Sequence, residues 1–453
     1  MNMEKLTKND EIEIKITGMT SDGWGVGRFG ELAVFVPKSI EGETVRTHII
    51  KVKKNYAVGR FVCAVEQSPH RIESDCPEFG RCGGCAFRHM DYGEECRIKR
   101  ERVAQAVRRI GGIDTPVDSI IPCDMTEHYR NKAQYPVREE NGEIRIGFFA
   151  QRSHRICDCA ACKLQNSEFE PVIECFKEWI RVCGVSAYDE SCGSGELRHI
   201  YIRRAHATGE IMVCAVINKD KITSGDTLVG LLQRNVPGLK SVIVNYNMKN
   251  TNVVLGERFE TLWGEDAIED VLCGRRLKIS PQSFYQVNSE QCEKLYEIAG
   301  KYAALTGEER LVDVYCGIGS IALSISDGAR EIYGFEIVPQ AVENAKENAS
   351  INGIPNAEFF CSDAADALKR IRDKGKIDVA VLDPPRKGCD EKLISDVVRA
   401  APERIVYVSC DPATLARDLQ IFSRSGYSVE KITPVDMFPR TAHVESVVLI
   451  TRA

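Results

Sequence analysis

Cys410 has a sequence environment suited to chemistry rather than to packing. It follows the apolar run Arg404–Val408, which predicts a buried strand, and it precedes Pro412, which predicts the first turn of a helix. The thiol is therefore expected at the carboxyl edge of a parallel sheet, where open α/β folds place their reacting groups. The dipole of the following helix can favour the thiolate form. We expect Cys410 to be a nucleophile.

A glycine-rich turn follows the predicted strand Leu311–Tyr315. Gly317 and Gly319 let the backbone approach a ligand closely, and Glu336 ends the next predicted strand roughly 20 residues later. The third glycine of a dinucleotide-binding fingerprint is missing, so NAD is disfavoured. S-adenosylmethionine (SAM) fits better, with the glycines beside its methionine part, Glu336 on the ribose hydroxyls and Asp363 beside adenine.

A further strand end carries the sequence Asp383-Pro-Pro-Arg386. Methyltransferases that act on exocyclic amines have an aromatic residue at the fourth position of a similar motif, and Arg386 replaces it here. The alternative acceptor is a carbon that must first be activated, such as C5 of uracil. Addition of the Cys410 thiolate to C6 makes C5 nucleophilic, and a base then removes the C5 proton. His443 and Glu445 open the last predicted strand, and we favour Glu445 as this base.

Three cysteines near the N-terminal quarter have the spacing of metal ligands. Cys76, Cys82 and Cys85 lie in a segment rich in Gly and Pro, and soft sulfur ligands suit zinc or an iron–sulfur cluster. Reduced cysteines without a metal are the less favoured alternative. A fourth ligand must come from elsewhere, and the candidates are Cys157, Cys159 and Cys162.

The composition indicates a globular protein of several domains. The chain has 453 residues, a formal net charge of −6 and 19 cysteines. Its charged N-terminus, and the lack of an apolar segment of membrane-spanning length, predict a cytoplasmic location with no membrane partner and no disulfide framework. No obligate protein partner is evident. The global charge does not support nucleic-acid binding, but the basic segments Arg46–Arg60 and Arg97–Arg109 favour contact with a polyanion.

The elements that position these residues fall into three predicted domains. Short strands over 11–16, 33–37, 44–53 and 56–65, with a glycine-rich turn at 23–28, predict an OB-like barrel within residues 4–68. Mixed strands and helices predict a central α+β domain over 69–275 that carries the cysteines. Alternating strands and helices over 276–453 predict a doubly wound, Rossmann-like α/β domain.

Motifs throughout the chain resemble those of the RNA (uracil-5-)-methyltransferase family. The barrel resembles a TRAM domain, an RNA-binding barrel of RNA-modifying enzymes, through the motif Asp22–Gly27. The other matching motifs are Ser283–Asn288, Asp313–Gly319, Asp383–Arg386, Val408–Asp418 and His443–Glu445. The family's Ser-Cys-Asn-Pro motif has Asp411 in place of asparagine here.

This resemblance implies roles for individual residues. Cys410 is expected to be the nucleophile and Glu445 the base. The cofactor and base pocket is expected to include Gln286, Tyr315, Glu336, Asp363 and Asp383. Family members with the N-terminal cysteine motif bind a 4Fe-4S cluster, which implies the ligands Cys76, Cys82, Cys85 and Cys162, with Cys159 as the nearest rival for the fourth position.

The leading hypothesis is an enzyme that methylates C5 of a uridine in structured RNA, with the barrel and the basic helix holding phosphates. Ribosomal-RNA enzymes of the family commonly have both the barrel and the cysteine cluster, whereas tRNA T-loop enzymes commonly lack both, so 23S rRNA is the favoured substrate. The alternatives are tRNA methylation, a non-catalytic RNA-binding protein, and a zinc or redox-sensing protein built on the cysteine cluster.

Overall fold

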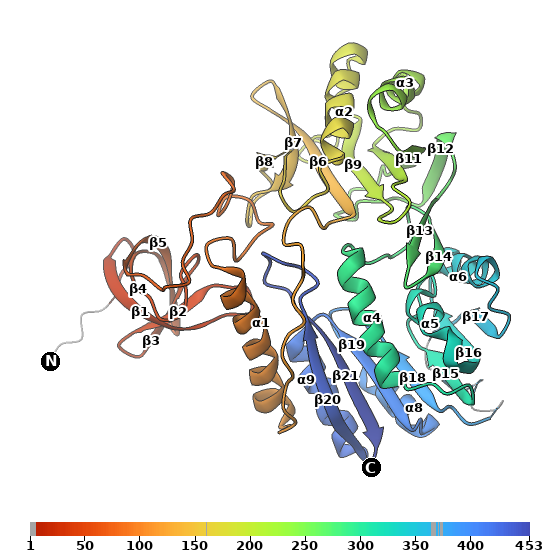
Figure 1. Cartoon of the computed structure of the whole chain (residues 1–453). Coiled ribbons are helices and arrows are strands. Elements are labelled where there is room, and N and C mark those ends of the chain that lie inside the picture. Colours follow the sequence, from red (N-terminus) through yellow and green to blue (C-terminus); the bar gives the residue numbers. More distant parts are fainter. Residues whose placement is uncertain (1–5, 160, 364–367, 370, 372–374) are drawn as a thin grey trace.

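The computed structural model describes residues 6–159, 161–363, 368–369, 371 and 375–453. A closed barrel, a central seven-stranded sheet, a two-stranded sheet and a C-terminal seven-stranded sheet follow one another along the chain (Figure 1). The predicted N-terminal barrel and C-terminal α/β sheet are confirmed. Residues 4 and 5 of the predicted barrel domain lie outside the described residues.

The barrel is closed by five strands in the order β1-β2-β3-β5-β4. These strands are β1 (Glu11–Met19), β2 (Gly25–Phe29), β3 (Leu32–Val36), β4 (Thr44–Val52) and β5 (Tyr56–Glu66). The sequence predicts a turn over 23–28, but strand β2 already begins at Gly25. A Cβ at Gly27 would lie 2.5 Å from the carbonyl oxygen of Lys15. The second half of the glycine-rich stretch therefore serves close strand contact rather than a turn.

The central sheet has the order β12-β11-β10-β9-β6-β7-β8. Its strands are β6 (Lys132–Glu140), β7 (Glu143–Phe149), β8 (Ile156–Asp158), β9 (Leu197–Arg204), β10 (Ile211–Ile217), β11 (Leu239–Tyr246) and β12 (Arg258–Gly264). Helices α2 (Phe169–Cys183) and α3 (Gly225–Asn235) pack on it around the fully buried Trp179. All seven residues of β10 are buried, which explains its continuous apolar sequence.

The C-terminal sheet has the order β17-β16-β15-β18-β19-β21-β20. Its strands are β15 (Glu309–Asp313), β16 (Ala329–Glu336), β17 (Ala357–Cys361), β18 (Val379–Leu382), β19 (Arg404–Ser409), β20 (Tyr427–Val435) and β21 (Glu445–Arg452). The helices are α4 (Ser289–Ala303), α5 (Ser320–Ser324), α6 (Pro339–Ile351), α8 (Glu391–Ala400) and α9 (Pro412–Arg424), with a short 3-10 turn η2 (Ser326–Gly328). The first five strands in this order are joined by parallel pairs, but β21 pairs antiparallel with both β19 and β20.

Helix α1 (Tyr92–Ala106) and the π-helical turn η1 (Val107–Gly111) connect the barrel to this C-terminal sheet. Figure 1 shows α1 between the barrel and α9. The chain after η1 runs along β20, where Val117 pairs with Ile432 and Ile121 pairs with Val435. Part of the predicted central domain thus packs as an extension of the C-terminal sheet.

A two-stranded hairpin, β13 (Ile268–Leu272) and β14 (Arg275–Ile279), precedes α4. The predicted domain limit between residues 275 and 276 falls within this hairpin, and the three domain boundaries stay predictions. No helix in the described part of the chain combines the length and the apolar character needed to cross a membrane.

Candidate active site

Cys410 and Glu445 lie opposite each other on neighbouring strands of the C-terminal sheet. Cys410 directly follows β19, Glu445 is the first residue of β21, and Ser409 pairs with Ser446 in antiparallel register. Cys410 lies one residue beyond this pair, and the Glu445 carboxylate is near enough to act on the charge of its thiol. Glu445 is 4% exposed, whereas Cys410 is partly exposed. The register therefore brings together the two residues to which the sequence assigns the chemistry.

The thiol of Cys410 is not held as a thiolate by the helix that follows it. Burial raises the pKa of the Cys410 thiol to about 12, and the Glu445 carboxylate adds to this rise while Arg386 opposes it. The N-terminus of α9 is capped by Asp411, whose Oδ1 accepts hydrogen bonds from the backbone N–H groups of Ala413 (2.9 Å) and Thr414 (3.0 Å). Asp411 thus occupies the N-cap of α9, and burial opposes the thiolate form that the helix dipole is expected to favour, so the role of the dipole stays a prediction.

Three carboxyl groups near the same strand ends also favour their neutral forms. Burial and then the Asp383 carboxylate raise the pKa of Glu445 to about 8. Burial raises the pKa of Asp383 to about 7, and burial together with Asp383 raises that of Asp313 to about 7. Carboxyl groups whose pKa lies near 7 are suited to proton transfer near neutral pH, because both of their protonation states are then accessible.

Arg386 and His443 form the outer side of this group. Arg386 Nη2 donates to His443 Nε2 at 3.3 Å. Burial, followed by the charge of Arg386, lowers the pKa of His443 to about 4, so its imidazole is neutral. With Nε2 engaged by a guanidinium, His443 is a poorer candidate for the base than Glu445.

The glycine turn lies at the same edge of the sheet as Cys410. Gly317 (φ 54°) and Gly319 (φ 83°) both have backbone conformations that favour glycine, and a Cβ on Gly317 would have open space around it. Asp313 ends β15, is completely buried, and its Oδ2 has no hydrogen-bond partner. A buried, unpartnered carboxylate oxygen beside an open glycine turn is a fitting place for a cationic ligand group.

The other predicted cofactor residues lie at different distances from this turn along the strand ends. Glu336 ends β16, and its Oε1 accepts from the backbone of Ile337 (2.8 Å) and Val338 (2.9 Å). Asp363 is exposed beyond β17. The Gln286 side chain is 8% exposed in the segment before α4. Tyr315 packs against an apolar cluster that contains Leu382 of β18 and Tyr407 of β19. Their roles in binding stay predictions.

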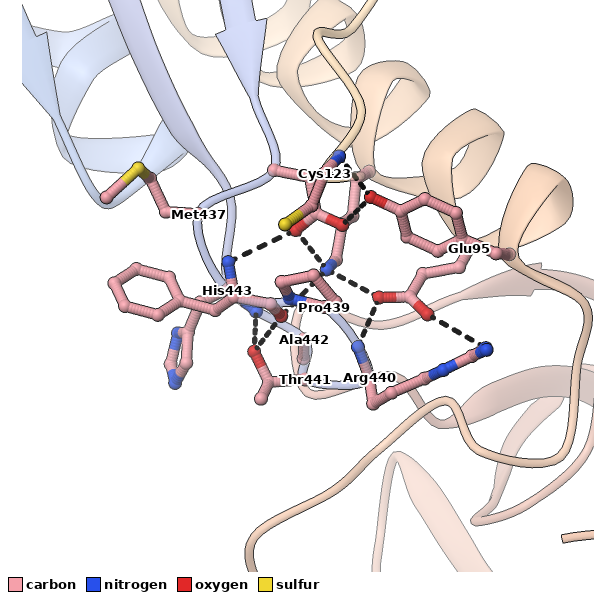
Figure 2. Close-up of polar contacts among 12 residues, drawn as sticks. Glu95, Cys123, Met437, Pro439, Arg440, Thr441, Ala442 and His443 are labelled. Atoms are coloured by element: carbon pink, nitrogen blue, oxygen red, sulfur yellow. Dashed lines mark hydrogen bonds and ion pairs between the residues drawn. The ribbon is translucent and has the colours of Figure 1, made fainter. Parts of the chain in front are cut away.

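Sequence reasoning missed a buried ionic cluster that fixes the chain between β20 and β21 (Figure 2). Lys99 of α1 is completely buried, and its Nζ donates to Glu95 Oε1 and to Asp436 Oδ1, both at 2.7 Å. Tyr92 donates its hydroxyl to Asp436 Oδ2 at 2.9 Å. The spacing of Glu95 and Lys99, one helical turn apart, was the only sequence signal. We call Tyr92, Glu95, Lys99 and Asp436 the α1 ion cluster.

The loop 436–444, held by the α1 ion cluster, leads directly to Glu445. The backbone N–H of Arg440, which has a left-handed φ of 68°, donates to Glu95 Oε1 at 2.7 Å. Its carbonyl accepts from the backbone N–H groups of Ala86 (2.8 Å) and Phe87 (3.1 Å). This loop therefore links α1, the segment just after the clustered cysteines, and the predicted base. Figure 2 shows its contact with Glu95 of α1.

Most cations of the predicted basic helix make intramolecular contacts. Arg97 pairs with Glu94 and Glu41, Arg100 donates to the carbonyl of Val117, and Arg102 donates to those of Ser21 and Ala442. With Lys99 buried as well, the helix does not present its charges as one phosphate-binding face. Among its cations, Arg108 and Arg109 at its end are exposed.

Five cysteines line one small cavity of about 80 Å³ beneath the turn 76–85. They are Cys76, Cys82, Cys85, Cys159 and Cys162. The structure thus brings the four predicted ligands together and leaves Cys159 beside them, whereas Cys157 is buried and does not line the cavity. Within the described ranges, no three His, Cys, Asp or Glu side chains are already arranged as ligands of a metal ion.

Comparison with known proteins agrees with this geometry. The tRNA (Uracil-5-)-methyltransferase family matches residues 264–453, and the TRAM domain matches residues 5–62. A protein named uncharacterized RNA methyltransferase from Clostridium acetobutylicum is 44% identical over 457 residues, with 99% of both chains covered. One of the same description from Halalkalibacterium halodurans is 43% identical over 447 residues, with 98% of each chain covered.

A solved structure shares the arrangement of the whole chain. The tRNA (uracil-54, C5)-methyltransferase of Pyrococcus abyssi, in complex with S-adenosyl-L-homocysteine, has a TM-score of 0.79 and 27% sequence identity. The match covers 97% of this chain and 99% of that one. By these similarities over its full length, the chain belongs to the RNA (uracil-5-)-methyltransferase family and carries a TRAM domain.

Proposed function

We propose that the protein uses SAM to methylate C5 of a specific uridine in 23S rRNA, with Cys410 as nucleophile and Glu445 as base. The observation that carries this proposal is the pairing of Ser409 with Ser446, which sets the thiol opposite the buried carboxyl. A nucleophile is needed for methylation of a pyrimidine carbon and is useless for methylation of an amine. We also propose a cytoplasmic location, because bacterial rRNA is made and modified in the cytoplasm.

The two side chains act in sequence on the ring. Cys410 releases its proton to solvent, and the thiolate forms a bond to C6, which moves the electron pair of the C5–C6 double bond toward C5 and the O4 carbonyl. After C5 has received the methyl group, the Glu445 carboxylate removes the C5 proton. The electron pair of that C–H bond re-forms the double bond and expels the Cys410 thiolate. Overall, one methyl group is transferred and one proton is released.

The residues at the strand ends fit SAM as the methyl donor. When bound, SAM supplies a methyl group made electrophilic by its sulfonium. The unpartnered Oδ2 of Asp313 and the open space above Gly317 suit the positively charged methionine part. The Glu336 carboxylate is oriented by two backbone N–H groups and would hold the ribose hydroxyls. The P. abyssi enzyme is a complex with S-adenosyl-L-homocysteine in its solved structure, which supports the same assignment.

The cysteine cavity fits the proposed 4Fe-4S cluster by the chemistry of its donors. Five cysteines line the cavity, and four thiolates are the ligand set that such a cluster takes. The Gly84 N–H points at Cys82 Sγ at 3.4 Å, and backbone hydrogen bonds to sulfur are characteristic of iron–sulfur sites. We propose Cys76, Cys82, Cys85 and Cys162 as the ligands, with Cys159 as a neighbour.

The choice of rRNA over tRNA rests on the combination of TRAM barrel and cysteine segment. A specific observation favours tRNA as the second candidate, because the P. abyssi enzyme is described as a tRNA methyltransferase and matches 97% of this chain, barrel region included. Incubation of unmodified 23S rRNA and tRNA transcripts with the protein and methyl-labelled SAM separates the two. Mass mapping should find 5-methyluridine in the 23S transcript; label in tRNA alone would replace rRNA by tRNA in the proposal.

A covalent trap tests the chemistry independently of the choice of RNA. In substrate RNA that carries 5-fluorouridine, C5 bears fluorine in place of hydrogen. A base cannot remove this fluorine as it removes a proton, so the bond from Cys410 to C6 persists. We expect a denaturation-resistant protein–RNA adduct, with its cross-linked peptide containing Cys410. Cys410→Ala should form no adduct and lose methylation at least 1,000-fold, as expected for loss of a nucleophile, which is worth roughly this factor or more.

The matched control is Cys192→Ala, which removes an exposed thiol outside the cysteine cavity. It should keep both the adduct and the activity. Full methylation by Cys410→Ala would overturn the mechanism, and a wild-type protein that binds RNA without methylating either transcript would indicate the non-catalytic alternative.

A further inference from the structure

A groove of about 360 Å³ runs between the barrel, the turn 76–85 and the loop 436–444. Side chains and backbone from four parts of the chain line it, among them Trp24, Lys38, Gly83, Gly84, Arg152 and His443. Ligand pockets in proteins measure roughly 300–1,000 Å³, so this volume suits one small planar ligand with its attached groups. The groove is separate from the strand ends that carry Cys410.

Trp24 presents an aromatic face to this groove from a tight turn. Its backbone N–H donates to Thr20 Oγ1 at 3.0 Å, and its carbonyl accepts from the backbone N–H of Thr20 at 2.8 Å. The guanidinium carbon of Arg152 lies 4.5 Å from the centre of the indole ring. The exposed guanidinium of Arg152 thus stacks on the ring in the absence of RNA, and a base that displaced it from the indole would release this cation to a phosphate.

The floor of the groove consists of bare backbone. Gly83 and Gly84 are exposed, and neither has a left-handed φ. A Cβ added to Gly84 would meet only Cys82 Sγ, at 3.5 Å. The backbone conformation does not require glycine at either position. The effect of the two glycines is instead to keep the floor of the groove free of side chains.

Charge and continuity point to a segment of RNA as the occupant. Lys38 and Arg152 contribute two positive charges to the walls, against the single negative charge of Asp22. At the other end, His443 both lines the groove and contacts Arg386, which acts on the charges of Cys410 and Glu445. A strand whose uridine is at Cys410 can thus pass His443 and continue into the groove.

We propose that this groove binds the nucleotide adjacent to the target uridine, with its base stacked on Trp24 and its phosphate beside Lys38 and Arg152. The inference rests on the proposed function and adds a binding site for unpaired RNA to it. Base recognition through an aromatic face tolerates any base, so Trp24 contributes RNA affinity and register rather than sequence choice.

Steady-state methylation by the full-length, cluster-loaded protein tests the site with Trp24→Ala and Trp24→Phe. Loss of one base–aromatic stack is worth roughly a tenfold change in affinity. Trp24→Ala should raise KM for the RNA transcript about tenfold, with kcat and the KM for SAM unchanged, and Trp24→Phe should recover most of the loss. Trp263→Ala, which removes a tryptophan of β12 that is 37% exposed and outside the groove, should match the wild type.

A second measurement combines an altered RNA with the wild-type protein and with Trp24→Ala, so the effect of the RNA change is first established in a protein that folds normally. Once the target uridine is mapped, the base on its 5′ or its 3′ side is removed to leave an abasic nucleotide. Removal on the correct side should raise KM about tenfold in the wild type and produce no further rise in Trp24→Ala, because both changes delete one contact. Equal KM for Trp24→Ala and wild type, or independent effects of the two changes, would overturn the inference.

Failure of the proposed function has a different outcome. If the wild type methylates neither transcript, the proposed activity is wrong, and the groove is then judged by binding alone. In that case, an unstructured RNA oligonucleotide should quench the fluorescence of a Trp263→Phe protein, in which the fully buried Trp179 is the only other tryptophan besides Trp24, and absence of quenching would reject the groove as an RNA site.

Discussion

At the scale of single residues, the site combines a partly buried thiol with carboxyl groups that repel its thiolate. Burial raises the pKa values of Cys410 (about 12), Glu445 (about 8) and Asp383 (about 7). The Arg386 cation opposes the rise at Cys410 and Glu445. The Cys410 thiol is therefore weakly ionised near neutral pH, and the proposed attack on uracil requires its deprotonation.

The methylation rate should rise with pH across the neutral range. Cys410 and Glu445 both act in their deprotonated forms, and both pKa values lie above their ordinary values of 9.0 and 4.5. The active form therefore grows as pH increases through about 8, the pKa of Glu445, and Cys410 continues the rise above it. We expect kcat/KM to increase roughly a hundredfold per pH unit at pH 6–7, where both groups are mostly protonated, and roughly tenfold per pH unit once the pH has passed the pKa of Glu445.

The pH profile has a matched control in Arg386→Met. Removal of the cation should raise the pKa of Glu445 and Cys410 further, because Arg386 lowers both, and so displace the profile toward higher pH. A flat wild-type profile between pH 6 and 9, or a displacement toward lower pH in Arg386→Met, would contradict the assigned roles.

At the scale of elements, α1 and the loop 436–444 are joined by charges that have no access to water. Lys99, Glu95 and Asp436 are completely buried, and Arg440 lies beside Glu95 with a separation of 3.6 Å. Buried ion pairs contribute little net stability compared with apolar residues, because desolvation offsets their attraction. Their directional contacts instead fix one position of the loop that leads to Glu445.

Replacement of Lys99 by methionine should destabilise the protein strongly. The change leaves the carboxylates of Glu95 and Asp436 buried without their cation, which typically costs about 3–5 kcal/mol. Chemical denaturation measures the loss. Arg109→Met is the matched control on the exposed end of the same helical segment and should change the free energy of unfolding by less than about 0.5 kcal/mol. An equal loss of unfolding free energy in both variants would show that the α1 ion cluster contributes no more to stability than an exposed residue does.

The sequence predicts the parallel strands of the C-terminal sheet because each is a short apolar run with a chemical group at its end. Strand β20 is not predicted in this way, because its apolar pattern is interrupted. Glu430 and Lys431 interrupt it where the register with β21 shifts, and Pro434 interrupts it again. The α1 ion cluster escapes it too, because Asp436 joins Lys99 only through tertiary packing. The capping of α9 by Asp411 is a local feature that the sequence contains, but burial of Cys410 depends on neighbouring strands.

At the scale of the whole molecule, the cysteine cavity and the groove share a wall. Cys82 and Cys85 line both spaces, and Trp24 faces them across the groove. The carbonyl of Arg440 then connects the following residues, Ala86 and Phe87, to the loop 436–444. A bound cluster would therefore set the shape of the surface that receives RNA rather than take part in methyl transfer.

Substitution of one proposed ligand tests this division of labour. Cys82→Ser should lower iron and sulfide in the anaerobically purified protein and raise the KM for RNA several-fold or more, because the groove floor loses its support. Dissociation of SAM, measured by calorimetry, should be unchanged, since the glycine turn lies on another sheet. Cys63→Ser, which alters an exposed barrel cysteine outside the cavity, should retain all three properties. Normal RNA affinity in an iron-free Cys82→Ser protein would show that a cluster in the cavity does not support RNA binding in the groove.

Strand β21 lies between β19 and β20, so the catalytic pair is completed by the element that is synthesised last of the three. A growing chain that ends before Glu445 already contains Cys410, yet it lacks both the base and the strand that holds β19 and β20 together. Such a chain is still attached to a ribosome, whose RNA contains uridine. Its thiol has no partner until synthesis passes β21, so activity should arise abruptly at that point, without a partly competent nascent form.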